Sequence, residues 1–505
     1  MEENDERFTA LGYIVIGGGI TGLYTSMELH KQKDPDPRIA LFEASDRFGG
    51  RIETVEMDGF LAEYGPMRFE KRAQPLLMRL IQDLQLETCY FHPYTPAKNL
   101  ESLFDLEKHE TRVSHGHPLN TLELLSLGIL RVLRQSGGDL NNPRDPRHWE
   151  WWAELDEEFY WRVRNEFTFN GIPLHKTGFW NVLSEVLSNR ALRKIIEYGT
   201  FYHVIHYNPN AAEWIIFWLR GLHPKEELVG IKQGTEALVT ELVKKLSSVQ
   251  PQPVSLYLNH CLTAIHQEEK NRLCLTFRKE DGECLVVHTR HLVLAIPQSP
   301  LKKLRHFFSD PIGQIIEGVI PIPLVKCFFV TKAPWWNEAT KPQTRSSSVP
   351  SREIHYYFRE EGNEKRGMVM IYGEPPFMNY WKTFIKKEPH QKAEINQDER
   401  LLEEYLKYLS PDSTASSPKE RKAQAEAITC FGIRDWSREP FEAGCHIWKP
   451  GVEVDKSMAL LSSFGLAGSH SDYQTIHICG EAYSDFQGFI EGGLRSALTV
   501  VKQIE

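Results

Sequence analysis

Residues 12–43 read GYIVIGGGITGLYTSMELHKQKDPDPRIALFE. The short apolar run at 13–16 predicts a buried strand, residues 21–31 predict a helix, and residues 38–42 predict a second strand. Gly17, Gly19 and Gly22 form the pattern G-x-G-x-x-G between the first strand and the helix, and Glu43 follows 21 residues after Gly22. The G-x-G-x-x-G pattern alone is weak evidence for nucleotide binding, because it also occurs in turns with a purely structural role. The register of strand, helix, second strand and acid predicts dinucleotide binding.

The glycine spacing has physical reasons. Gly17 allows the tight turn from strand to helix, Gly19 lets the backbone approach a pyrophosphate at the helix N-terminus, and Gly22 lets helix and strand pack closely. Glu43 can accept hydrogen bonds from a ribose. The cofactor contacts predicted in this unit are Gly17, Gly19, Ile20, Thr21, Gly22, Glu43 and Ala44.

The stretch ASDRFGGRI at residues 44–52 indicates which dinucleotide binds. Together with Glu43 it resembles the E-x-x-x-x-x-G-G-R segment of the FAD-dependent amine oxidases. The resemblance implies that Gly49, Gly50 and Arg51 run beside the phosphates of the cofactor. It favours FAD over NAD, because NAD-dependent dehydrogenases do not usually carry this extension.

Length and composition are those of a globular protein. The chain has 505 residues, 41% hydrophobic and 25% charged, which excludes a disordered chain and is enough for about two to four domains. The net charge of −9, with Lys and Arg scattered, argues against a nucleic-acid partner. No apolar run approaches the ~18 residues of a membrane span. The acidic N-terminus MEENDERFTA argues against a secretory signal.

The cysteines predict the cellular setting. The chain has eight, and none forms a C-x-x-C pair. This usage is typical of reduced, mostly buried thiols in a cytoplasmic protein, and the sequence predicts no metal site.

Further patterns extend the resemblance along nearly the whole chain, from residue 13 to about residue 502. Helices are predicted at 75–86, 119–134, within the aromatic-rich block 149–222, in 227–246 after a turn, at 393–409 and after Gly488. Strands are predicted at 254–266, 273–277, 284–288, 291–297, 354–358, 368–373 and 475–481, and loops at 135–146, 338–353 and 410–422.

The resemblance implies an α/β fold, the flavin amine oxidase fold, with three parts. A Rossmann-like FAD-binding domain is expected from residues 8–66, 229–300 and 455–505. A mixed-sheet substrate-binding domain is expected from 67–105 and 301–454, and a helical domain from 106–228.

The resemblance also implies cofactor contacts far from the glycine turn. Leu262 would contact the adenine end, Glu481 the ribityl and phosphate region, and the helix start at Gly488 the flavin ring, where the helix dipole favours a reduced, anionic flavin. The further contacts implied are Gly65, Pro66, Met67, Arg68, Trp436, Gly480, Phe489 and Ile490.

Arg68, in the element Gly65-Pro66-Met67-Arg68, separates the branches of the family. L-amino acid oxidases carry this element, and their arginine clamps the substrate carboxylate. A buried carboxylate needs a fixed cation, and the arginine fork supplies two parallel hydrogen bonds. Tyr372 matches a second carboxylate contact of the family. Arg68 alone could equally bind a phosphate or lie on the surface, and a tyrosine on a strand is often core.

Three other residues are candidates for the catalytic site. Phe489 stands where the family often has tryptophan, and it would form an apolar wall over the substrate α-carbon. Trp448 is a candidate both for the side-chain pocket and for the core. Lys326 matches a lysine that holds a water near flavin N5, and a lysine within the apolar run VKCFF needs a partner.

The sequence is therefore identified as a member of the FAD-dependent amine oxidases, L-amino acid oxidase branch. The implied reaction turns an L-amino acid, large neutral or aromatic, and oxygen into a 2-oxo acid, ammonia and hydrogen peroxide, with hydride transfer to flavin N5. A homodimer is implied. The alternatives are a monoamine or polyamine oxidase, an amino-acid monooxygenase that yields an amide, and a flavin-binding protein without turnover.

The run WSREPFEAGC at residues 436–445 bears on how the cofactor is held. Monoamine oxidases carry a similar W-x-x-E-P-x-x-G-G-C run whose cysteine is joined covalently to the flavin. Amino acid oxidases usually lack that cysteine. Because Arg68 and Tyr372 favour the amino-acid branch, we expect non-covalent FAD, with a covalent link at Cys445 as the alternative.

Overall fold

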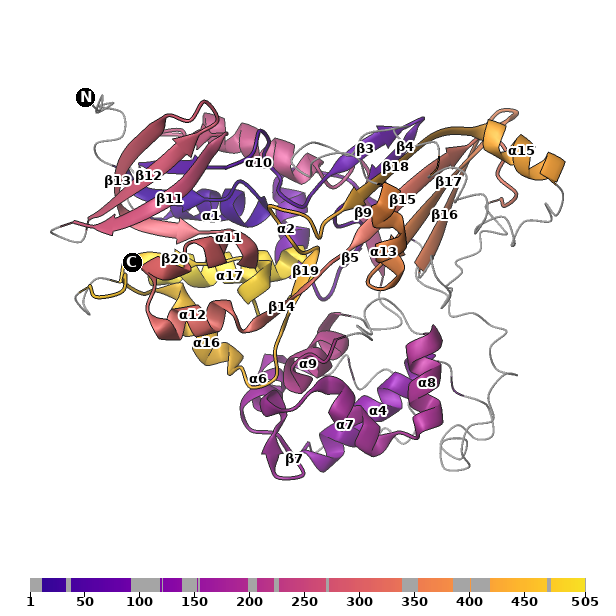
Figure 1. Ribbon diagram of the computed structural model, residues 1–505, viewed down its shortest axis with the longest axis horizontal. Coiled ribbons are helices and arrows are strands. Elements are labelled where there is room, and N and C mark those ends of the chain that lie inside the picture. The colour runs from indigo at the N-terminus through magenta and orange to yellow at the C-terminus, as the bar shows by residue number, and fades with distance from the viewer. Residues whose placement is uncertain are drawn as a thin grey trace.

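Figure 1 shows the computed structural model of the chain. It describes residues 11–32, 38–91, 119, 121–138, 152, 155–198, 207–221, 227–268, 272–337, 353–384, 400, 418–469 and 474–504. A large sheet with helices fills the left of the view, a second sheet lies to the right, and a group of helices lies below them.

The large sheet is parallel at its centre. Its strand order is β10-β2-β1-β13-β12-β11, with β20 beside β13. The strands are β1 (Leu11–Ile16), β2 (Ile39–Phe42), β10 (Ser255–Tyr257), β11 (His260–Gln267), β12 (Leu273–Lys279), β13 (Cys284–Leu294) and β20 (Ile476–Ile478). β1, β2, β10, β13 and β20 pair in parallel, and β11, β12 and β13 form an antiparallel meander. All four residues of β2 are buried, as expected of a parallel strand covered on both faces.

Helices cover one face of this sheet and the meander folds over the other. α1 (Ile20–Lys31), α2 (Pro75–Asp83), α10 (Ala237–Ser248) and α17 (Ile490–Gln503) share one apolar core with Val15 and Leu41 of the sheet. On the opposite face, Phe42 of β2 stacks on Phe277 of β12 with ring centroids 4.2 Å apart. The chain enters α1 directly from β1, so the glycine turn lies at the carboxyl edge of the parallel strands.

The second sheet has the order β16-β17-β15-β18. Its strands are β15 (Val325–Thr331), β16 (Glu353–Glu361), β17 (Glu364–Gly373) and β18 (Ile428–Asp435). The sequence predicts a mixed sheet here, and all pairings among these four described strands are antiparallel. β15 is buried throughout. Cys327 and Phe329 belong to one core and Phe328 and Val330 to another, so the sheet separates two apolar layers.

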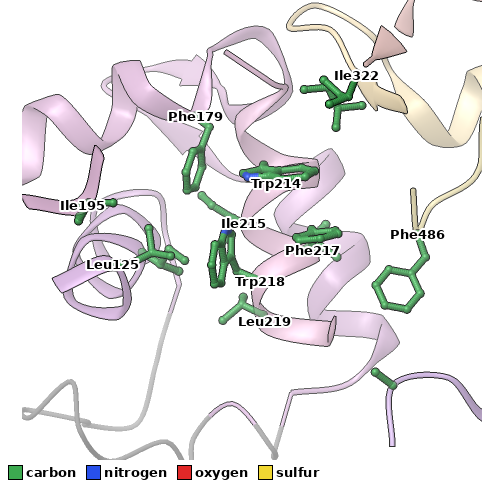
Figure 2. Close-up of a cluster of buried hydrophobic side chains, with 14 of the residues drawn as sticks. Leu125, Phe179, Ile195, Trp214, Ile215, Phe217, Trp218, Leu219, Ile322 and Phe486 are labelled. Carbon is green, nitrogen blue, oxygen red and sulfur yellow. The ribbon is translucent and has the colours of Figure 1, made fainter. Parts of the chain in front are cut away.

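The helical group is built around α9 (Ala211–Gly221), in which every residue is buried. Its other helices are α4 (Thr121–Gln135), α6 (Glu157–Asn165), α7 (Phe179–Val186) and α8 (Asn189–Tyr198). Figure 2 shows Trp218 of α9 on the side of Leu125 and Phe217 on the side of Phe486. α9 therefore packs against the helical group on one side and against the segment before α17 on the other.

Shorter elements connect these parts. The strands are β3 (Thr54–Met57), β4 (Phe60–Glu63), β5 (Phe69–Glu70), β6 (Thr88–Tyr90), β7 (Thr168–Phe169), β8 (Ile172–Pro173), β9 (Leu228–Ile231), β14 (Val319–Ile322) and β19 (Cys445–Trp448). The helices are α11 (Gln298–Lys303), α12 (Asp310–Ile316), α13 (Phe377–Trp381), α15 (Pro418–Ala427) and α16 (Val454–Ser462), with 3₁₀ turns at Leu174–Lys176, Arg305–Phe307, Lys382–Phe384 and Glu481–Tyr483.

The predicted α/β fold is confirmed, and several segments differ from their prediction. The loop predicted at 410–422 is helical from Pro418, where α15 begins. The single strand predicted at 254–266 is two strands, β10 and β11, because Asn259 takes a left-handed conformation (φ 58°) and turns the chain. The strands predicted at 284–288 and 291–297 merge into β13. The predicted turn before α10 contains a strand, β9, which pairs with β5 and β6.

Some predictions stay untested. The predicted helix at 393–409 apart from residue 400, most of the loop at 135–146, and residues 338–352 and 410–417 lie outside the described residues. The three domain boundaries stay predictions. Among the described helices, none combines the length and apolar character needed to cross a membrane.

Candidate cofactor and substrate site

A cavity of about 510 Å³ lies between the two sheets and α9. Its lining comes from the glycine turn, residues 49–52 and 64–69, α9, β11, β15, β17, residues 436–446 and the start of α17. Cavities of several hundred Å³ with mostly apolar walls and a few polar groups are typical ligand sites. This cavity joins the predicted nucleotide site to the predicted substrate residues.

The glycine turn has the form that a dinucleotide requires. Gly17 has φ +105°, and a Cβ on Gly22 would lie 1.9 Å from the Gly17 carbonyl oxygen, so both positions need glycine. Gly19 lines the cavity, and a Cβ there would meet no described atom within 4 Å. Gly19 also caps α1, whose first turn has neither a side-chain cap nor an acidic residue. The open space beside this helix N-terminus fits a phosphate group.

Glu43 shapes the same turn. Its Oε2 accepts a hydrogen bond of 2.6 Å from the backbone N–H of Gly18. Its Oε1 accepts bonds of 2.8 Å from the backbone N–H and the hydroxyl of Ser45. The carboxylate lines the cavity, and its Oε2 has a further lone pair, so the predicted ribose contact stays a prediction that this geometry permits.

Arg51 and Glu481 tie the nucleotide segment to the end of the chain. Arg51 donates to the Gly444 carbonyl at 2.8 Å and to Glu481 Oε2 at 2.9 Å. Glu481 also accepts from the backbone N–H groups of His446 at 2.8 Å and Gly488 at 2.9 Å. Burial alone would raise the pKa of Glu481, but Arg51 and His446 lower it to about 2. The carboxylate is therefore ionised at neutral pH and fixes the start of α17.

A row of polar residues crosses the second sheet. Glu353 of β16 is paired with Tyr372 of β17, Tyr372 with Lys326 of β15, and Lys326 with Arg434 of β18. Residues directly opposite one another in an antiparallel sheet face the same side. Lys326 and Tyr372 line the cavity, while Arg434 pairs with Glu53 at 3.0 Å. The strand register thus brings Lys326 and Tyr372 to the cavity and aligns them with Glu353 and Arg434, which lie outside its lining.

Lys326 is buried at the centre of this row. Its Nζ donates to the backbone carbonyl of Glu63 at 2.9 Å and to that of Gly65, and lies 5.1 Å from the centre of the Tyr372 ring. Burial lowers the pKa of Lys326 to about 7, although the charge of Glu63 opposes the shift. Burial raises the pKa of Glu63 to about 7. Burial therefore favours the uncharged form of both groups.

Arg68 lies in the cavity lining and contacts a buried acid. Its Nη1 is 3.4 Å from Glu353 Oε1, and the same oxygen is 2.6 Å from His355 Nε2. The Arg68 side chain is 9% exposed and that of Glu353 2% exposed. Glu353 and His355 lie outside the lining, so the acid stands behind the arginine as seen from the cavity. The attraction between Arg68 and Glu353 offsets the cost of burying each charge, which would be unfavourable for either residue alone.

Three stacked aromatic rings, Trp214, Phe217 and Phe489, form part of the cavity lining, and we call them the aromatic wall. The rings of Trp214 and Phe217 are 4.1 Å apart and nearly parallel at 5°. Phe489 stacks on Phe217 with centroids 5.5 Å apart. Figure 2 shows Trp214 and Phe217 projecting from the same helix, α9. The aromatic wall joins the helical group to the start of α17.

Trp448 is a core residue, and its interpretation as part of the side-chain pocket is wrong. It is 1% exposed and does not belong to the cavity lining. Its indole donates to the Ser484 carbonyl at 2.9 Å, and its ring packs on Tyr483 with centroids 6.0 Å apart. β19 directs this side chain into the core beneath the large sheet.

The remaining predicted residues meet in one cavity. The lining includes Gly17, Gly19, Ile20, Thr21, Glu43, Ala44, Gly50, Arg51, Gly65, Pro66, Met67, Arg68, Leu262, Lys326, Tyr372, Trp436, Gly480, Glu481, Gly488, Phe489 and Ile490. Gly22 lies outside it and acts by packing. Cys445 is in the lining, and burial raises its pKa. The contacts of these residues with a cofactor stay predictions.

Among the residues of the site that sequence reasoning missed are Glu353, Trp214 and Phe217. Glu353 falls at the end of a stretch predicted as a surface loop, although the alternating run IHYYF begins directly after it. Trp214 and Phe217 belong to a segment interpreted as a packed helical layer. The run AAEWIIFWLRG is apolar on all sides, which indicates a buried helix but does not say which side meets a cavity.

Comparison with known proteins agrees with this geometry. The family model for flavin-containing amine oxidoreductases matches residues 20–505. The chain is 22% identical to amine oxidase [flavin-containing] B of Sus scrofa, over 97% of this chain and 85% of that protein. It is 20% identical to Aplysianin-A of Aplysia kurodai, over 99% of this chain and 91% of that protein.

Other matches are shorter or structural. Coproporphyrinogen III oxidase of Bacillus subtilis is 42% identical over 79 residues, which are only 15% of this chain and 16% of that protein. A solved structure of putrescine oxidase bound to putrescine has 14% identity and a TM-score of 0.65, over 98% of this chain and 99% of that one. At this identity the likeness establishes the fold alone.

Proposed function

Because the chain belongs to the flavin-containing amine oxidoreductase family, and is therefore a flavin-dependent oxidoreductase, we propose that it is an FAD-dependent L-amino acid oxidase. The proposed substrates are oxygen, water and an L-amino acid, preferably one with a large neutral or aromatic side chain. The proposed products are a 2-oxo acid, ammonia and hydrogen peroxide.

The observation that carries this proposal is the arginine in the cavity lining. Arg68 is nearly buried and lies on the same cavity as Lys326 and Tyr372. An amino acid brings a carboxylate into such a site, and a buried carboxylate needs a fixed cation that can donate two hydrogen bonds. In the proposed complex Arg68 and the Tyr372 hydroxyl bind this carboxylate. Glu353, behind Arg68, keeps the guanidinium in place.

The residues proposed to hold FAD are those of the glycine turn and their partners. The turn and the N-terminus of α1 would bind the phosphates, Glu43 the ribose, and Glu481 would fix the helix start that faces the ring. When bound, the flavin accepts the electrons removed from the amine-bearing carbon. In its protonated form Lys326 would supply positive charge where oxygen is reduced, although burial lowers its pKa to about 7.

We propose that FAD is held without a covalent bond. Burial raises the pKa of Cys445, so its sulfur is a protonated thiol at neutral pH and a poor nucleophile. After acid precipitation of the protein, free FAD should appear in the supernatant and be identified there by chromatography. A washed pellet that keeps its yellow colour would instead favour a covalent link at Cys445.

The aromatic wall supports the proposed preference for substrates with a large neutral or aromatic side chain. Its three rings give the cavity an apolar surface that a large neutral or aromatic side chain would cover, with favourable ring stacking. We further propose a cytoplasmic homodimer. The support is the family resemblance for the dimer and the cysteine usage for the compartment, and light scattering on the purified protein tests the dimer.

The test is a peroxide assay with L-amino acids, D-amino acids and simple amines. The wild type should oxidise L-amino acids to 2-oxo acids; an amide product would indicate a monooxygenase. Arg68→Ala should keep its flavin but lose roughly 2–5 kcal/mol of transition-state binding, and Arg68→Lys should lose less. Lys71→Ala, which removes a cation of an exposed ion pair, is the matched control. Unchanged efficiency in flavin-loaded Arg68→Ala would refute the carboxylate clamp.

The Arg68–Glu353 pair favours a second candidate, an amine or polyamine oxidase. Glu353 already neutralises part of the Arg68 charge, and a cationic amine has no carboxylate for Arg68 to bind. In that case Arg68→Ala would uncover the negative charge of Glu353, and amine oxidation would be unchanged or faster. The same variant therefore separates the two candidates by the direction of its effect. A flavin-binding protein without turnover would oxidise neither class.

A further inference from the structure

Three potential metal ligands lie together on the antiparallel meander, outside the lining of the cofactor cavity. Glu268 follows β11, Cys274 is on β12 and His288 is on β13. One ligand atom from each lies within 4.8 Å of the other two. Glu268 Oε2 is 3.1 Å from His288 Nδ1. None of the three residues contributes to the cofactor cavity.

The strand register creates this cluster. Cys274 is paired directly with His288 between β12 and β13, so their side chains face the same side of the meander. The neighbouring Leu273, Leu275 and Val287 are fully buried on the opposite side. Cys274 and His288 are half-buried and face outward. The ligands are therefore held by regular strands rather than by loops.

Glu268 reaches the pair because the chain turns back after β11. Its backbone N–H donates to the Arg272 carbonyl at 2.7 Å, which closes the connection between β11 and β12. The Glu268 carboxylate then lies over the adjacent strands. The three ligands are separated by 6 to 20 positions in the sequence, so no local ligand motif marks them.

We propose that Glu268, Cys274 and His288 bind one Zn²⁺ ion. Thiolate, imidazole and carboxylate are the three ligand types that zinc accepts in tetrahedral sites, with water in the fourth position. Mg²⁺ and Ca²⁺ require oxygen ligands and are not suited to a thiolate. Binding would release the Cys274 thiol proton to solvent. The cysteine spacing in the sequence predicts no metal site, so this proposal differs from that prediction.

One cation competes for the same carboxylate. Arg272 Nε is 3.7 Å from Glu268 Oε2, and the Arg272 side chain is 44% exposed. Ion pairs at this exposure contribute little to stability. Arg272 can therefore turn into solvent when a dication arrives, because a metal–carboxylate bond is stronger than this contact.

Zinc titration by calorimetry tests the proposal. The flavin-loaded protein, without an affinity tag, is treated with a chelator, dialysed and titrated with Zn²⁺. One equivalent should bind per chain. Cys274→Ser and His288→Gln should each weaken binding by at least about tenfold. Cys284→Ser is the matched control, because Cys284 is an exposed cysteine of the same meander and should change nothing. Wild-type binding in Cys274→Ser, or no binding in the wild type, would refute the site.

Thiol protection gives a second readout on the unaltered chain. Zn²⁺ should slow alkylation of Cys274 by iodoacetamide, whereas Mg²⁺ should not, and Cys284 should react equally in all samples. Peptide mass spectrometry separates the two cysteines. Equal alkylation of Cys274 with and without Zn²⁺ would overturn the proposal, even if the variants fail to fold.

Discussion

The two ends of the cavity are built in different ways. At the nucleotide end the contacts join residues that are close in the sequence, and most of them involve backbone groups. Examples are the 2.6 Å hydrogen bond from the Gly18 N–H to Glu43 and the 2.8 Å hydrogen bonds from Ser45 to the same carboxylate. At the substrate end they join distant segments, such as Arg68 to Glu353 and Phe217 to Phe489.

This difference predicts that the two ends are sensitive to different kinds of substitution. The nucleotide end is limited by space. An added Cβ on Gly22 would lie 1.9 Å from a backbone oxygen, and Gly17, Gly49 and Gly50 have positive φ angles that favour glycine. The substrate end is limited by charge and ring contacts, because buried side chains compensate one another across strands. Substitutions should therefore fail for different reasons at the two ends.

The strongest test of this contrast compares two glycines of the same turn. Gly22→Ala should prevent folding or strongly lower the unfolding temperature, because its Cβ would lie 1.9 Å from a backbone oxygen that cannot move aside. Gly19→Ala should fold normally, because its Cβ meets open space, but should lose flavin, because that space is proposed for a phosphate. Circular dichroism and flavin absorbance measure the two outcomes. A well-folded Gly22→Ala protein would contradict the packing role.

The contrast also explains what could be predicted from the sequence. The nucleotide unit was predictable because its strand, turn and helix follow within about thirty residues and each glycine has a local reason. Arg68 and Tyr372 were predicted from family resemblance rather than from physics. Glu353 could not be predicted, because its role depends on the β16–β17 register and not on its neighbours.

The sequence patterns of the helical segments gave the least information about which residues line the site. In α9 every residue is buried, so its apolar pattern marks a core helix without separating Trp214, which lines the cavity, from Trp218, which does not. For Trp448, on strand β19, the sequence likewise left both the pocket and the core open, and the structure places it in the core. Which part of the fold a buried side chain contacts depends on the tertiary structure, and the local hydrophobic pattern does not reveal it.

The next prediction tests the link between the two ends. Glu481→Gln should lower stability and flavin retention, because Arg51 and His446 lose their anionic partner. The pKa of Glu481 is about 2 in the folded protein and about 4.5 when unfolded, so its contribution is present above about pH 4.5 and is lost as the pH falls toward 2. The shift corresponds to about 3 kcal/mol.

Chemical denaturation at neutral pH measures the effect of Glu481→Gln. Glu87→Gln is the control, because Glu87 belongs to an exposed pair with Lys232 and should change stability little. If Glu481→Gln matched the wild type in both stability and flavin content, the network around Glu481 would not connect the two ends.

A smaller effect is expected at the aromatic wall. Phe217→Leu keeps an apolar side chain but removes stacking worth about 0.5–1.5 kcal/mol, so kcat/KM for aromatic substrates should fall about two- to tenfold relative to small ones. Trp218→Phe is the control, because Trp218 lies on the other side of α9 in Figure 2 and outside the cavity lining. Equal changes in both variants would mean that α9 acts by packing alone.

The smallest effect at neutral pH is expected at a contact within the nucleotide half that joins segments far apart in the sequence. His291 of β13 and His477 of β20 approach at 3.1 Å between Nδ1 and Nε2, and His477 Nδ1 is 2.6 Å from the Ser462 carbonyl. Burial lowers the pKa of both histidines to about 4. Unfolding restores a pKa of about 6.5, so the unfolded chain binds more protons between these values. Their contribution to stability is therefore constant above about pH 6.5 and is lost as the pH falls toward 4.

His477→Gln removes one of these titrations while keeping a side chain that can donate to Ser462. It should lower stability slightly at pH 8, and its further loss between pH 6.5 and 4.5 should be smaller than that of the wild type. Free energies of unfolding from urea titrations across this range measure the difference, and the other titrating groups, common to both proteins, largely cancel from it. Parallel curves for the two proteins would contradict the assignment. A shallower curve would mean that this strand pair, 186 positions apart in sequence, makes the nucleotide half depend on a distant contact as the substrate half does.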